Sequence, residues 1–130
     1  MDDLVTLVVE PAAAVSGAQV RIVLAVDVPD GVHIEPHLPA EPFLIPTVVT
    51  VNGLTDVTVS YPEPVKKDLG WNDVALTVLE GPLEFVVTGI RTEETTVSGG
   101  LSYQPCLGGA CLPPRTSVWS IEVGAAVVGA

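Results

Sequence analysis

The two cysteines are the residues of this 130-residue chain whose type and spacing could do chemistry. They stand as Cys106-Leu-Gly-Gly-Ala-Cys111 and are followed after one residue by two prolines. Gly108 and Gly109 allow the chain to bend back until the two sulfur atoms meet, which the strict geometry of a disulfide requires. We therefore expect a Cys106–Cys111 disulfide near the surface, on a hairpin-like loop at the edge of a sheet.

Such a disulfide would stabilise the fold only modestly, but its short loop suits it to thiol–disulfide exchange. In the chain-entropy model, closing so short a loop contributes roughly 2 kcal/mol to stability. When an external thiolate opens the bond, the released thiol stays beside its partner, so a mixed disulfide can be resolved within the molecule. From spacing alone, a structural disulfide that pins a hairpin remains the alternative. Two cysteines supply only half a zinc site, and His33 and His37 have no supporting spacing, so we expect no metal.

Strands, with very little helix, are the elements that must position these cysteines. Hydrophobic residues make up 48% of the chain and aromatic residues only 5%, with Val the dominant apolar type and 12 each of Gly and Pro. Beta-branched side chains favour pleated strands, and Gly and Pro favour turns. In residues 19–28, Val20, Ile22, Leu24 and Val26 alternate with other residues and could face a core. The expected strands are 4–10, 19–28, 46–51, 57–61, 74–79, 83–90, 97–104 and 117–123.

Turn signals separate these strands at Ser16-Gly17, 29–31, Asn52-Gly53, 80–82 and Gly99-Gly100. Short strands at this spacing predict an all-β fold, a single-domain antiparallel β-sandwich of immunoglobulin-like shape. We expect the domain to cover residues 1–123, with 124–130 as a tail or linker. The proline-rich segment 33–46 is expected to be an ordered crossover, and the polar segment 63–73 an exposed loop.

The acidic charge of the chain argues against one class of binding partner. The formal net charge is −11, and no basic stripe interrupts the acidic surface, so we expect no binding to nucleic acid. No apolar run is long enough to span a membrane, and the acidic start of the chain does not resemble an export signal.

His33 and His37 are interpreted as packing or hydrogen-bonding residues because no nucleophile elbow accompanies them. Trp119 is expected to pack on the sheet.

Three segments of the sequence resemble the N-terminal domain of DsbD-type thiol:disulfide interchange proteins. The most specific is 101–116, LSYQPCLGGACLPPRT, which resembles the redox-active segment of that family. The early crossover of the family is matched by GVHI at 31–34 and FLIPT at 43–47. YPEP at 61–64 and VLEG at 78–81 are similar to the segments that enter and leave its cap loop.

The resemblance implies an immunoglobulin-like periplasmic or otherwise extracytoplasmic domain with protein-disulfide reductase or electron-transfer activity. It would receive electrons from a thioredoxin-like protein or domain and pass them to a client disulfide oxidoreductase, without a cofactor. It also implies that Cys111 forms the mixed disulfide and Cys106 resolves it. A full-length protein would carry a membrane or thioredoxin-like domain as well, or the domain would act in trans.

The resemblance places a cap over the disulfide at residues 68–72, where Leu69 or Trp71 would shield the sulfurs. The chain lacks the aromatic-rich cap of the best-known members of the family. Tyr103, Pro113 and Arg115 are expected at the docking surface or cap, and Arg115 could also favour the Cys111 thiolate. The rival function is an immunoglobulin-like binding or adhesion module with an inert disulfide. A metal-chaperone sandwich is disfavoured by the single Met and scattered His.

Overall fold

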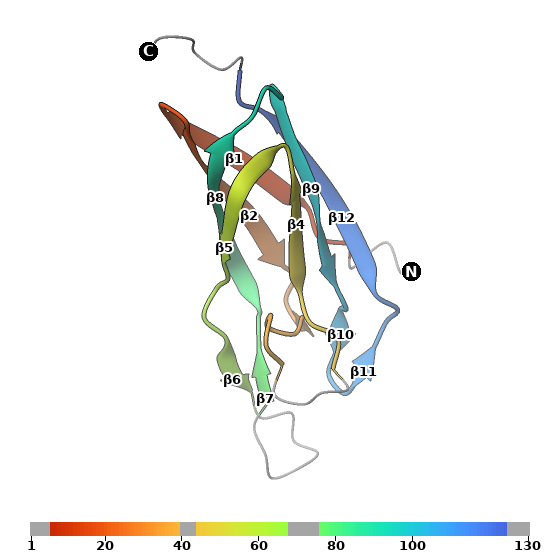
Figure 1. The fold of residues 1–130 in the computed structure, drawn as a ribbon. Helices are drawn as coiled ribbons and strands as arrows, with labels where there is room; N and C mark the ends of the chain where they lie inside the picture. Colours follow the sequence, from red (N-terminus) through yellow and green to blue (C-terminus); the bar gives the residue numbers. More distant parts are fainter. Residues whose placement is uncertain (1–5, 40–43, 68–75, 125–130) are drawn as a thin grey trace.

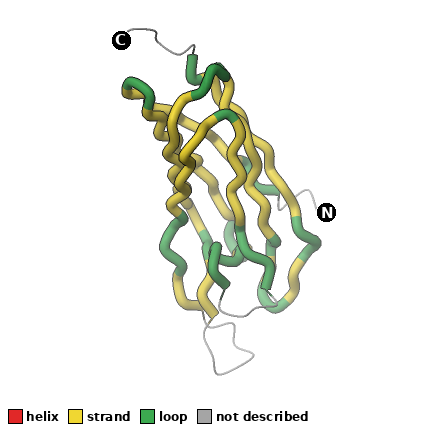
Figure 2. Tube along the Cα trace, viewed as in Figure 1, coloured by secondary structure: helices red, strands yellow, loops and turns green. Residues whose placement is uncertain are grey.

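The structure, a computed structural model, describes residues 6–39, 44–67 and 76–124, and every regular element in these ranges is a β-strand (Figures 1 and 2). In chain order the strands are β1 (Val9–Ser16), β2 (Gln19–Val28), β3 (Val32–His33), β4 (Val48–Asn52), β5 (Leu54–Ser60), β6 (Val65–Lys67), β7 (Leu76–Val78), β8 (Gly81–Arg91), β9 (Thr96–Tyr103), β10 (Cys106–Leu107), β11 (Ala110–Cys111) and β12 (Arg115–Glu122).

Two antiparallel sheets form the body of the molecule. One has the strand order β1-β2-β8-β5 and the other β12-β9-β4 (Figure 1). Each sheet contributes apolar side chains to one core, including Ile22 and Phe85 from the first sheet and Leu101 and Trp119 from the second. The predicted all-β, immunoglobulin-like antiparallel sandwich is confirmed.

Strand β2 shows how the sequence pattern produces this core. Val20, Ile22, Leu24 and Val26 are all at most 3% exposed, while the residues between them are more exposed. Successive side chains of a strand point to opposite faces, so these four lie on the face toward the second sheet. Their predicted orientation is confirmed.

The first strand lies further along the chain than predicted. The expected strand 4–10 is replaced by β1, which pairs with β2 from Val9 opposite Val26 to Ser16 opposite Gln19. The alanines and the proline of β1 have low strand propensity, but β1 is an edge strand, where Pro is tolerated. Leu7 lies before β1 and is fixed by two hydrogen bonds to side chains. Its N–H donates to the Tyr103 hydroxyl (2.8 Å), and its carbonyl accepts from Ser117 Oγ (2.5 Å).

Gly99 and Gly100 lie inside β9 and do not form the predicted turn. A Cβ atom at Gly99 would lie 1.8 Å from the carbonyl oxygen of Thr50 and 2.9 Å from the Trp119 ring. The missing side chain lets the neighbouring strand and the indole come close. These glycines therefore serve packing, and the indole, at 5% exposed, packs on the sheet as predicted.

The two irregular segments are only partly as predicted. After β3 the described part of the crossover has no long strand, and it is anchored where Thr47 Oγ1 donates to the Glu35 carbonyl oxygen (2.5 Å). Within the predicted loop 63–73, residues Val65–Lys67 instead form β6, because they pair in register with β7 from Val65 opposite Val78. Residues 68–73 lie outside the described part of the chain.

A third, small sheet with the order β11-β10-β3 carries the cysteines. It lies at the same end of the sandwich as β6 and β7 (Figure 1). Among the described residues, no helix of the length and apolarity needed to cross a membrane is found.

Candidate functional site

Cys106 and Cys111 form a disulfide that joins the two arms of a hairpin. The sulfur atoms are 2.02 Å apart and the Cα atoms 3.9 Å apart. The cysteines lie directly opposite each other in β10 and β11, and Leu107 lies opposite Ala110. Strand β11 is the edge of its sheet. The expected disulfide on an edge hairpin is confirmed.

The turn of this hairpin depends on glycine. Gly108 has φ = 61°, the left-handed region that residues with a Cβ atom rarely adopt. A two-residue turn with positive φ at its first central residue has the twist that matches two antiparallel strands. Gly108 thus brings the arms of the hairpin into the register that places the sulfurs together.

The two sulfurs have different environments. Cys106 is 2% exposed, and its Sγ lies 3.9 Å from the carbonyl oxygen of Gln104. Cys111 and the turn residues are exposed. A partner protein approaching from solvent therefore meets Cys111 first.

A buried histidine and a buried glutamate lie beside Cys106. His33 in β3 is the direct cross-strand partner of Cys106, so the row across the small sheet is Cys111, Cys106, His33. Directly opposed residues point to the same face of a sheet, as do residues two apart in an extended chain. Glu35 follows His33 by two positions, and its Oε2 lies 3.9 Å from His33 Nε2.

The carboxyl group of Glu35 is in an unusual environment. Glu35 is 2% exposed, and its Oε1 has no hydrogen-bond partner among the described residues. Burial raises the pKa of this carboxyl group above its ordinary value of 4.5 because the charged form loses its hydration. The same burial therefore favours the neutral, proton-bearing form of the carboxyl group.

His33, Glu35 and Cys106 each place one potential ligand atom within 4.8 Å of the others. A disulfide sulfur carries no thiolate charge, so the oxidised molecule offers only the nitrogen and oxygen donors of this group. Zinc sites use three or four protein ligands. The oxidised form therefore does not provide a complete zinc site here.

From the sequence, His33 is expected to be a packing or hydrogen-bonding residue, and Glu35 is not among the candidate site residues. Their contact with the cysteine hairpin depends on the pairing of β3 with β10, which is far along the chain. The signal available in the sequence was the spacing of two polar residues, His33 and Glu35, around an apolar Ile34. In an extended segment that spacing places both polar side chains on one face.

The other expected site residues are distributed differently. Tyr103 is fully buried, and its hydroxyl accepts the Leu7 N–H bond, so in this conformation it supports the fold and offers no docking surface. Pro113 is exposed and Arg115 half-buried at the start of β12. Leu69 and Trp71, expected to shield the disulfide, lie outside the described residues.

His37, in the crossover segment, makes contacts that support the fold. Its ring stacks on Tyr61 with centroids 4.0 Å apart, and its Nδ1 lies 3.0 Å from the carbonyl oxygen of Thr47. This is the packing and hydrogen-bonding role expected for it from the sequence.

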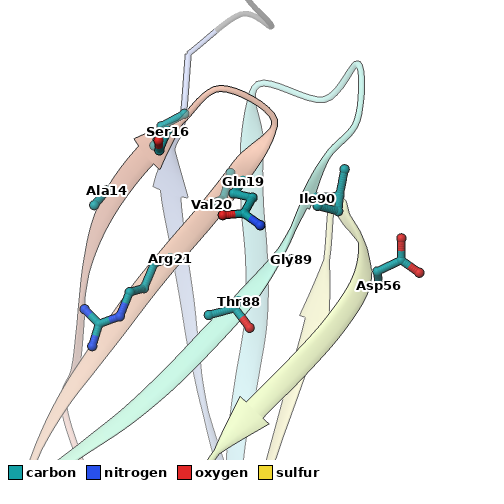
Figure 3. Close-up of a pocket in the computed structure, with 10 residues that line it drawn as sticks. Ala14, Ser16, Gln19, Val20, Arg21, Asp56, Thr88, Gly89 and Ile90 are labelled. Carbon is teal, nitrogen blue, oxygen red and sulfur yellow. The ribbon is translucent and has the colours of Figure 1, made fainter.

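An open hollow of about 530 Å³ lies away from the cysteines, where the β1–β2 hairpin meets β5 and β8 (Figure 3). Arg21 and Asp56 are the charged residues that line it, among mostly small and apolar neighbours. No cysteine or histidine lines this hollow. It therefore supplies no group for thiol chemistry, and the hairpin remains the candidate site.

The fold and the site together define a β-sandwich with a disulfide in an edge hairpin. Comparison with protein families gives a match to "Thiol:disulfide interchange protein DsbD, N-terminal" over residues 5–122. The chain therefore belongs to this family. A comparison with curated protein sequences gives no match.

Two solved structures have similar folds. The N-terminal periplasmic domain of ScsB from Proteus mirabilis aligns with a TM-score of 0.75 and 17% identity over 98% of this chain and 51% of that one. The Neisseria meningitidis DsbD n-terminal domain in the reduced form aligns with a TM-score of 0.52 and 17% identity, over 90% of this chain and 86% of that one. This chain thus spans about half the length of the ScsB domain.

Proposed function

We propose that this chain is a thiol–disulfide exchange module that passes reducing equivalents between thioredoxin-like partners by opening and closing the Cys106–Cys111 bond. The observation that carries the proposal is the unequal exposure of the two cysteines across the hairpin: Cys111 is exposed and Cys106 is 2% exposed. Family membership supports it. An inert disulfide in a binding module requires no such asymmetry.

The proposed reaction begins at the exposed sulfur. A partner thiolate attacks Cys111 Sγ and forms a mixed disulfide, and the electron pair of the broken bond goes to Cys106 Sγ. A second thiol of the partner then attacks the partner's own sulfur and releases Cys111, which leaves this domain reduced and the partner oxidised. The reverse steps reduce a client oxidoreductase, with Cys106 as the resolving thiol.

The geometry of the small sheet suits this cycle. The short hairpin keeps the released Cys106 thiol opposite Cys111, so intramolecular resolution has a high effective concentration. Neither cysteine is a member of the apolar cluster that joins the two large sheets. The fold can thus hold the reactive pair in place while the bond opens.

The proposal includes the cap expected from the family, with Leu69 or Trp71 as the shield. What supports it is the position of the strands that flank this segment. Leu79, which follows β7, exchanges two backbone hydrogen bonds with Ile34 (2.9 and 2.8 Å), next to the partner of Cys106 in β3. The β6–β7 pair is therefore attached to the strand that borders the cysteine hairpin.

An extracytoplasmic location is also part of the proposal. The ScsB domain of similar fold is described as periplasmic. A reversible disulfide needs a compartment in which it is not held permanently reduced, and the bacterial periplasm is one. Thioredoxin-like proteins of that compartment are the expected partners.

The deciding experiment is the reduction potential of the Cys106–Cys111 bond, measured in glutathione buffers of graded composition. A potential above about −300 mV is expected for an exchange-active bond, because structural disulfides usually lie below that value. A lower potential, together with failure of reduced thioredoxin to open the bond, would show that the disulfide is a structural staple.

A further inference from the structure

The buried polar pair beside Cys106 has no role in the reaction as described so far. Burying a histidine and a glutamate costs stability, because both lose hydration. The pair does not contribute to the apolar core, and one carboxyl oxygen of Glu35 has no hydrogen-bond partner among the described residues. Buried titratable groups with perturbed environments are concentrated at reacting sites.

The proposed reaction requires proton transfer to and from Cys106. When the disulfide opens, Cys106 Sγ receives the electron pair and becomes a thiolate that is 2% exposed. A buried thiolate is costly, so it must gain a proton, and it must lose this proton again before it can attack. Cys111 is exposed and can exchange its proton with water directly.

We propose that His33 and Glu35 act as one proton-transfer pair for Cys106. Each has a nitrogen or oxygen atom within 4.8 Å of Cys106 Sγ and of the other, and His33 lies directly opposite Cys106 in the sheet. The proposal rests on the proposed exchange function and adds the residues that handle its buried proton.

The proton balance of each step follows. On opening, the partner sulfur bonds to Cys111 Sγ, the Cys106–Cys111 bond breaks, and a proton moves from the pair to the Cys106 thiolate. On closing, the pair takes the Cys106 proton, the thiolate attacks Cys111 Sγ of the mixed disulfide, and the partner leaves as a thiolate. The raised pKa of Glu35 fits this role, because a carboxyl group that keeps its proton to higher pH than an exposed one remains a proton donor over a wider pH range.

Other titratable groups on the surrounding elements are placed less well for this task. His37 is stacked on Tyr61, and Tyr103 is bonded to Leu7. Other ionisable residues of these elements include Cys111 on β11, Glu80 after β7 and Arg115 at the start of β12. Neither Cys111 nor Glu80 belongs to the group of ligand-type atoms that His33, Glu35 and Cys106 form.

The first test measures how the His33–Glu35 pair affects the ionisation of Cys106, and it needs no partner protein. In Cys111→Ser, Cys106 is a free thiol whose ionisation is followed by the ultraviolet absorbance of the thiolate, in the presence of a chelator so that no metal contributes. Adding Glu35→Gln is expected to lower the midpoint by about one pH unit or more, because Glu35 has lost its proton at the alkaline pH where a buried thiol ionises, and the substitution then removes a neighbouring negative charge. Adding His37→Gln, a change in the same crossover, is the matched control and should leave the midpoint in place.

The second test measures the rate at which a small thiol opens the disulfide. With both cysteines present, Glu35→Gln and His33→Gln are each expected to slow opening of the bond by dithiothreitol about tenfold or more in mildly acidic buffer, and less in alkaline buffer. His37→Gln should keep the original rate and pH profile. Circular dichroism confirms that each variant is folded, and Glu35→Gln preserves the shape of the side chain.

The outcomes separate this inference from the function on which it rests. Normal exchange with an unchanged pH profile in both pair variants, and an unmoved Cys106 midpoint, would overturn the proton-transfer role while leaving the exchange function intact. A moved midpoint in a protein whose disulfide does not react with thioredoxin would support the coupling of the pair to Cys106 but reject the exchange function.

Discussion

Cys106 and Cys111 are direct partners across a two-residue turn, yet solvent reaches them unequally. Cys106 lies between β11 and β3 and is 2% exposed, whereas Cys111 lies on the edge strand and is exposed. An attacking thiolate must approach along the axis of the bond, from outside. We therefore expect the two cysteines to have different roles in the proposed exchange.

The first prediction concerns these roles. Cys106→Ser leaves the exposed Cys111 as a single thiol, which should trap a thioredoxin-like partner that lacks its own second cysteine as a stable mixed disulfide, because neither protein then has a resolving thiol. Cys111→Ser should trap little, because its remaining thiol is buried. Non-reducing electrophoresis measures both after mixing with such a partner, whose single cysteine is first activated as a mixed disulfide with a small thiol. Equal trapping by the two variants would contradict the assignment.

The second prediction is that the reduced domain stays folded. The disulfide closes a loop of six residues, for which the chain-entropy term is roughly 2 kcal/mol. Neither cysteine is a member of the apolar cluster that joins the two large sheets. Urea unfolding of the oxidised and reduced forms should therefore differ by about that amount, with two complete cooperative transitions. Loss of the β-type circular dichroism signal on reduction at room temperature would instead favour a structural staple.

The third prediction tests the turn. Gly108→Ala places a Cβ atom at φ = 61°, which costs roughly 1 to 2 kcal/mol. The strain should weaken the hairpin and lower the equilibrium constant for disulfide formation against glutathione by roughly fivefold or more. Gly109→Ala is the matched control, because Gly109 is not among the glycines with positive φ. The same loss in both variants would show that something other than backbone conformation limits the bond.

The fourth prediction concerns the cap expected from the family. If Leu69 and Trp71 shield the disulfide, changing both to Ala should speed its reduction by dithiothreitol, since a small thiol then meets less apolar cover. Thermal unfolding of the same variant provides the control. An unchanged rate with a lowered melting temperature would show that these side chains pack the segment and do not gate the sulfurs.

The sequence predicted the features that depend on local pattern. The alternation in β2 and the glycines between the cysteines were sufficient to place a buried strand face and a hairpin disulfide. The Ala-rich β1 was missed because its strand state comes from pairing with β2, which its own residues do not favour. Gly99 was misinterpreted as a turn residue, because the close approach of Thr50 and the Trp119 ring appears only in the folded sheet.

The part of the site that could not be predicted is the environment of Cys106. The neighbours His33 and Glu35 are far from it in sequence, and the register of β3 on β10 brings them together. No spacing rule connects a buried carboxyl group to a cysteine across such a distance along the chain. Only the fold shows that this carboxyl group is removed from water beside the disulfide.

The last prediction follows from the raised pKa of Glu35. Folding raises this pKa above its ordinary value of 4.5, so between the two values the folded protein binds more protons than the unfolded chain. The stability that comes from protonated Glu35 is fully present below the ordinary value and is lost as the pH rises through the raised one. The free energy of unfolding should therefore fall from mildly acidic to neutral pH more steeply in the original protein than in Glu35→Gln, whose amide does not titrate. Glu84→Gln, a change at an exposed position on β8, should keep the original slope. Urea unfolding across this pH range measures all three proteins, and parallel curves for Glu35→Gln and the original would show that the buried carboxyl group titrates as it does in water.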